Sequence, residues 1–78
     1  MAMTHLSDRI TSDPEVCFGK PCIRGMRLRV IDVLDLLAAG TDEAALLSEY
    51  PYLEAEDIPA CLAFASQIVA QHGEIALA

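Results

Sequence analysis

The chain has 78 residues, 54% of them hydrophobic, and carries a formal net charge of −7 from 12 acidic and 5 basic residues. This length allows a single domain and excludes a large enzyme with its own substrate cleft, while the hydrophobic content excludes a disordered tail. The acidic balance also argues against non-specific binding to nucleic acid, which requires clustered Lys and Arg.

Residues 1–8 are small, polar and terminal, and are predicted to form a flexible N-terminus. The first six residues lack the basic start and apolar stretch of a signal peptide, and no apolar run approaches the length of a membrane span. Three cysteines without an export signal indicate reduced thiols. We therefore expect a cytoplasmic protein that does not bind membranes.

Residues 9–30 are predicted to form a β arm. A first strand is expected over residues 9–12, followed by a loop with a short extended piece at 22–24. A second strand is expected over residues 26–30, because Leu28 and Val30 alternate with arginines. One face of this strand is therefore apolar and the other cationic.

Residues 31–73 are predicted to form three helices, and residues 74–78 a short tail. The first helix begins at Ile31 and ends before Gly40, and the second has Thr41 as its N-cap and ends before the proline at position 51. The third begins near Glu56 and closes at Gly73, with a proline in its first turn. The short glycine-containing link between the first two helices is typical of a helix-turn-helix unit, although a plain three-helix cluster has such links too.

No catalytic, metal or cofactor site is expected. Cys17 and Cys22 lack the second Cys or His pair that a zinc site requires, and no cysteine has a neighbouring His that would activate it. The sequence also contains no glycine-rich phosphate loop. These absences favour a binding protein over an enzyme.

Charge is distributed unevenly along the chain. All five basic residues lie in the first 29 positions, so residues 1–30 carry +2, whereas residues 31–78 carry nine acidic residues and no Lys or Arg, or −9. Such asymmetry indicates separate interaction surfaces.

One run of residues has the character of a family motif: Gly19-Lys20-Pro21-x-Ile23-Arg24-Gly25-x-Arg27. Together with Arg9-Ile10-Thr11-x-Asp13-Pro14, Tyr50-Pro51-x-Leu53 and Glu56-Asp57-Ile58, it resembles a small bacterial family catalogued as domain of unknown function 433. The resemblance covers residues 9–66. Two positions depart from the family pattern: Met26 stands where Thr is usual, and Glu54-Ala55 where a Ser or Thr is usual.

The resemblance implies a mainly α, homeodomain-like or winged-helix-like three-helix domain with an N-terminal β arm. It also implies a homodimer in which the arms of two chains meet, and similarity to VapB-type antitoxins that pair with a PIN-like nuclease toxin. The arm residues expected at such a dimer contact are Ile10, Ile23, Leu28 and Val30.

The candidate DNA-binding residues are Lys20, Arg24, Arg27 and Arg29, because guanidinium groups suit phosphate and guanine. The alternative is that they pair with acidic residues of the helices. The second and third predicted helices carry acidic residues and no Lys or Arg, so any DNA contact is expected through the arm.

The candidate partner-binding residues are Tyr52, Glu54, Glu56 and Asp57. The three carboxylates suit the positive, metal-binding cleft of a nuclease. Tyr52 is included because Tyr is enriched at protein interfaces. A solvated acidic face is the alternative. Our leading hypothesis is an antitoxin-like protein that neutralises a PIN-like nuclease and binds operator DNA through its arm. The second is a dimeric protein adaptor without DNA binding.

Overall fold

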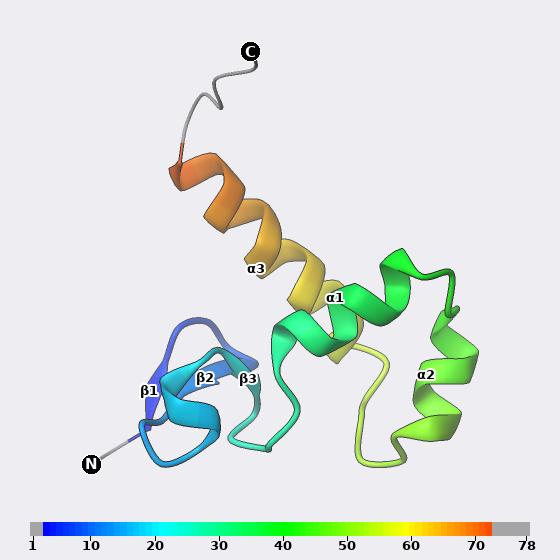
Figure 1. Ribbon diagram of the computed structural model, residues 1–78, viewed down its shortest axis with the longest axis horizontal. Helices are drawn as coiled ribbons and strands as arrows, with labels where there is room; N and C mark the ends of the chain where they lie inside the picture. Colours follow the sequence, from blue (N-terminus) through cyan, green and yellow to red (C-terminus); the bar gives the residue numbers. More distant parts are fainter. Residues whose placement is uncertain (1–2, 73–78) are drawn as a thin grey trace.

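The computed structural model describes residues 3–72, and over these residues the chain forms three short strands and three α-helices (Figure 1). The strands are β1 (Thr4–His5), β2 (Ile10–Ser12) and β3 (Cys22–Ile23), with a 3-10 turn, η1 (Cys17–Gly19), between the last two. The helices are α1 (Val30–Ala38), α2 (Glu43–Glu49) and α3 (Asp57–Gln71). This is a small mixed α/β domain, and the expectation of a mainly α fold understates the sheet.

The sheet is antiparallel in the order β1-β2-β3, and β2 carries its inner face onto α3. Ile10 pairs with Ile23 in the register of β2 and β3, and both side chains are fully buried. The outer strand β1 pairs with β2 although both of its residues are exposed. Residues 4–5 lie in the segment predicted to be flexible. Strand pairing uses backbone groups, so the exposed side chains of β1 carry no apolar pattern from which the strand could have been predicted.

The strand predicted over residues 26–30 does not form. After β3 the chain turns at Arg24 and Gly25, whose φ angles of 46° and 74° are those of a type I′ turn, and Met26 N–H donates to the Ile23 carbonyl at 2.8 Å. Only an isolated bridge between Cys22 and Arg29 follows. Helix α1 then begins at Val30, so the alternation of Leu28 and Val30 reflects burial without a strand.

The predicted helix boundaries are close to those observed, with one wrong N-cap. Asp42, not Thr41, caps α2, and its carboxylate accepts the Ala45 N–H at 2.8 Å. Helix α1 begins one residue earlier than predicted, where the Asp32 carboxylate accepts the backbone N–H of Arg29 at 3.3 Å and its guanidinium at 2.7 Å. The end predicted for the third helix at Gly73 and the tail over residues 74–78 lie outside the described residues.

The hydrophobic core joins the arm to the helices. Val33, Leu46, Leu53, Ile58 and Cys61 contribute from the helical part, and Ile10, Ile23, Leu28 and Val30 contribute from the arm. The last four are the residues predicted to form a dimer contact, and each is at most 6% exposed within a single chain. Their apolar surface is therefore already buried on folding and is not available to a second arm.

Candidate functional site

A buried carboxylate joins the arm to the start of α3. Asp57 is 0% exposed, and its Oδ1 lies 2.8 Å from Arg9 Nη1 while its Oδ2 lies 2.9 Å from Arg24 Nη2. The backbone N–H of Glu54 donates to Oδ2 as well, at 2.9 Å. Arg9 Nη1 also contacts Glu54 Oε1 at 2.6 Å. Two guanidinium groups from the arm therefore converge on one carboxylate.

The turn after β3 positions Arg24 for this contact. The left-handed backbone at Arg24 and Gly25 directs the arginine side chain toward the loop before α3, where its Nη2 also donates to the Tyr52 carbonyl at 2.8 Å. Thr11 Oγ1 accepts the Gly25 N–H at 2.8 Å and fixes the turn against β2. The most specific run of the family motif thus forms a rigid turn that presents Arg24 to Asp57.

The surroundings of Asp57 favour its charged form. Burial alone would raise the pKa of this carboxyl, but hydrogen bonds from Arg24, from the Glu54 backbone and from Arg9 outweigh burial and lower the pKa to about 2. The same contacts raise the pKa of both arginines above its ordinary value, for Arg9 chiefly through Glu54 and for Arg24 chiefly through Asp57. This ion-pair network is permanently charged at physiological pH.

Two of the four candidate DNA-binding residues form ion pairs with carboxylates of the chain itself. Arg24 is bound to Asp57, and Arg29 Nη2 contacts Asp32 Oδ1 at 2.7 Å. Lys20 and Arg27 are exposed, and neither makes an ion pair among residues 3–72. The alternative from the sequence, that arm arginines pair with acidic residues of the helices, therefore describes two of the four.

The four candidate partner-binding residues lie close together in sequence but differ in accessibility. Tyr52 is 53% exposed and packs edge-on against Tyr50, with ring centroids 6.2 Å apart. Glu56 is exposed, and Glu54 is exposed while holding Arg9. Asp57 is enclosed by the protein itself, so its assignment to partner contact is wrong.

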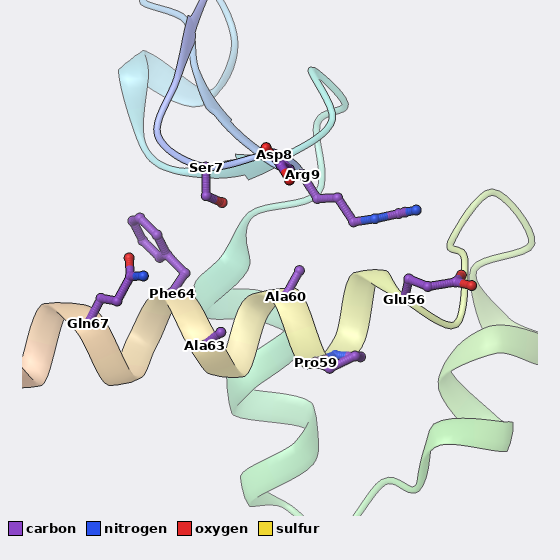
Figure 2. A pocket seen from close by; sticks show the side chains of 9 residues that line it. All are labelled: Ser7, Asp8, Arg9, Glu56, Pro59, Ala60, Ala63, Phe64 and Gln67. Atoms are coloured by element: carbon purple, nitrogen blue, oxygen red, sulfur yellow. The ribbon is translucent and has the colours of Figure 1, made fainter.

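A hollow with a mixed polar and apolar lining lies between the arm and α3 (Figure 2). Its volume is about 390 Å³, with Ser7 and Arg9 on the arm side facing Ala60 and Phe64 on the helix side. Glu56 and Gln67 mark its two ends along α3. The hollow mixes both charges, and in the described part of the chain no three His, Cys, Asp or Glu side chains gather as a metal site would require.

A second, apolar groove of about 490 Å³ runs between α1 and α3 and was not predicted from the sequence. Pro21, Ile31, Leu34, Phe64, Ile68 and Val69 line most of it, with Lys20 at one end. Residues 58–72 contain no Asp, Glu, Lys or Arg, and this absence is the sequence signal that could have revealed an unpaired helix face.

Two of the three cysteines are inaccessible. Cys22 and Cys61 are buried, and burial raises the pKa of each thiol to about 11. Cys17 is half-buried in η1. Within residues 3–72 no helix is both long and apolar enough to cross a bilayer.

Comparisons with known proteins agree with the motif. The family model described as protein of unknown function (DUF433) matches residues 10–65. A Sinorhizobium fredii protein described as uncharacterized protein y4eO is 41% identical over 49 residues, which are 63% of this chain and 22% of that protein. The crystal structure of a DUF433 member from Anabaena variabilis superposes with a TM-score of 0.75 at 33% identity, covering 85% of this chain and 65% of that one. The chain thus spans less than two thirds of both relatives.

Proposed function

The chain belongs to the DUF433 family, and we propose that it acts as an antitoxin-like binding protein that recognises a basic protein partner through its acidic helices. The observation that carries this proposal is which charged side chains form ion pairs within the chain and which remain exposed. Arg9, Arg24 and Arg29 are held by carboxylates of the chain itself. Among the exposed charged side chains of residues 3–72, acidic residues outnumber the two basic ones, Lys20 and Arg27.

Exposed carboxylates lie along the helical part of the chain, three of them on α2 or at its N-cap. Among the described residues, these side chains make no ion pair and are exposed: Asp35, Asp42, Glu43, Glu49 and Glu56. A surface with one sign of charge attracts partners of the opposite sign and accelerates their association. The cleft of a nuclease is positively charged because it binds phosphates, so a PIN-like nuclease is the partner class that fits this surface.

We do not extend the proposal to DNA binding through the arm. Phosphate contact requires accessible cations, and the internal ion pairs leave Lys20 and Arg27 as the two arm cations available for it. A homeodomain-like or winged-helix-like reader would also place the start of a recognition helix against DNA. Here the exposed Glu56 is the N-cap of α3 and would be repelled by phosphate, and Asp57, the first residue of the helix, is buried.

The test is inhibition of a purified PIN-like nuclease, measured by cleavage of single-stranded RNA. We expect the chain to inhibit cleavage, and the double variant Glu43→Lys/Glu49→Lys to inhibit at least tenfold more weakly, because both side chains are exposed carboxylates and neither forms an ion pair within residues 3–72. Asp8→Lys is the matched control, since it reverses an exposed charge on the arm. Equal inhibition by all three proteins would contradict the proposal.

DNA binding is tested separately with the DNA upstream of the gene. We expect weak binding that does not change in the Lys20→Ala/Arg27→Ala variant. Tight binding that weakens steeply with salt and disappears in this variant would instead support the operator-binding hypothesis.

A further inference from the structure

The apolar groove between α1 and α3 has no partner in the chain. Val69 is 57% exposed and Ile31 is 48% exposed, and both line the groove. The second half of α3 extends beyond the rest of the domain (Figure 1), so the described residues contain no element that covers this face. Such an exposed apolar face on a small domain marks an interaction site.

We propose that a second copy of this chain docks in this groove, with Phe18 of each copy inserted into the groove of the other. The inference is independent of the proposed binding to a basic partner, because it uses a different face of the domain.

The distribution of charge on the chain indicates which partner occupies the groove. Two copies each carry −7, so they repel unless they meet through an uncharged surface. Residues 58–72 provide that surface, because α3 carries no Asp, Glu, Lys or Arg after Asp57. A basic protein partner, by contrast, gains nothing from this face and is attracted to the carboxylates around α2. The groove has no acidic side chain and has Lys20 at one end, so it suits a second acidic chain better than a basic one.

Phe18 is the side chain that would fill the groove of the other copy. Its side chain is 94% exposed, although it belongs to an ordered turn in which Cys17, Phe18 and Gly19 all have positive φ. Hydrogen bonds fix this turn, including Ser12 Oγ donating to the Gly19 carbonyl at 2.6 Å. A rigid turn that costs backbone strain to present an aromatic ring to solvent is typical of an interface anchor.

The position of the turn makes the contact reciprocal. Phe18 lies two residues before Lys20, which lines one end of the groove. Each copy therefore offers an anchor and a groove side by side, as a closed two-fold contact requires. Of the arm residues expected from the family resemblance, Ile10, Ile23 and Leu28 do not line the groove, and Val30 lines it with only 3% of its surface exposed.

Sedimentation velocity of the full chain over a range of micromolar concentrations tests the docking. We expect a dimer, and we expect Val69→Glu to weaken it at least tenfold. Ala70→Glu adds the same charge one residue later, on the opposite face of α3, and should leave the dimer unchanged. A monomer at every concentration overturns the proposal and leaves the groove for a different protein. A dimer that both variants weaken equally, or that neither weakens, also overturns it.

A fluorescence experiment tests the anchor. The sequence has no Trp, so Phe18→Trp introduces a single reporter at this position. We expect its emission to shift to shorter wavelength as the dimer forms and to return to the solvent-exposed position when Val69→Glu is added. Emission that stays at the solvent-exposed position in the dimer overturns the assignment of Phe18.

Discussion

Replacing Asp57 by Asn removes the charge on which Arg9 and Arg24 converge while keeping the shape of the side chain. Asn keeps one acceptor oxygen, and its NH₂ group cannot accept. The variant therefore loses either the Arg9 contact made to Oδ1 or the Arg24 and Glu54 N–H contacts made to Oδ2. Both arginine side chains are 31% exposed and can turn toward water. The variant should therefore fold with a loosened contact between the arm and α3.

The pKa of Asp57 gives the magnitude. In the folded chain it is about 2, against an ordinary value of 3.8. Each tenfold change in proton affinity corresponds to about 1.4 kcal/mol, so the charged carboxylate contributes about 2 kcal/mol to the free energy of unfolding. Because the folded pKa is the lower one, this contribution is complete above about pH 5 and is lost as the pH falls through 3.8 toward 2.

Urea unfolding followed by circular dichroism, at neutral pH and down to about pH 2, measures both effects. We expect Asp57→Asn to lower stability by about 2 kcal/mol at pH 7, or the melting temperature by roughly 10 °C, and to remove part of the acid-induced loss seen in the unmodified chain. Asp32→Asn is the matched control, because Asp32 also pairs with an arginine but is 34% exposed, and it should cost about 1 kcal/mol or less. Equal stability and equal pH dependence of Asp57→Asn and the unmodified chain would refute the reasoning.

Three further outcomes follow from local geometry. Gly25→Ala should lower the free energy of unfolding by about 1 kcal/mol, because the φ of 74° at this turn disfavours a Cβ; an unchanged urea midpoint would contradict this. Asp42→Ala should cost about 1 kcal/mol through loss of the α2 N-cap, whereas Thr41→Ala should have little effect, and thermal melts of the two variants decide between these caps. In native protein at pH 8, a thiol reagent should label Cys17 well before Cys61, since Cys61 is buried and its pKa is about 11; mass spectrometry that finds Cys61 labelled first would refute the burial argument.

Helix positions were largely predictable because their signals are local. The predicted and observed starts of the helices differ by one residue, and the error at α2 arose because Thr41 and Asp42 are both good N-caps. Sequence propensity ranks such neighbours almost equally. The strand predicted over residues 26–30 failed for a related reason: a buried, alternating segment looks the same whether it pairs as a strand or leads into a helix.

The candidate sites were less predictable, because they depend on which side chains meet. Arg24 and Asp57 both belong to motif runs, yet nothing in their spacing of 33 residues indicates that they form a buried pair. The sequence therefore indicates a DNA-binding role for Arg24, whereas in the fold Arg24 pairs with Asp57 and joins the arm to α3. The exposed Phe18 and the groove between α1 and α3 were missed because aromatic and apolar residues usually indicate core.

The sequence by itself determined the family, the three helices and the division of charge into a basic arm and an acidic body, since each of these is written in residue type and short spacing. Only the tertiary structure decided which charged side chains pair with each other and which remain exposed. By bringing the arm onto α3, it binds Arg9 and Arg24 to Asp57 and leaves the carboxylates around α2 exposed. Pairing across 33 or 48 residues is a property of the folded chain, because burial and hydrogen-bond geometry select one partner among many carboxylates of equal charge.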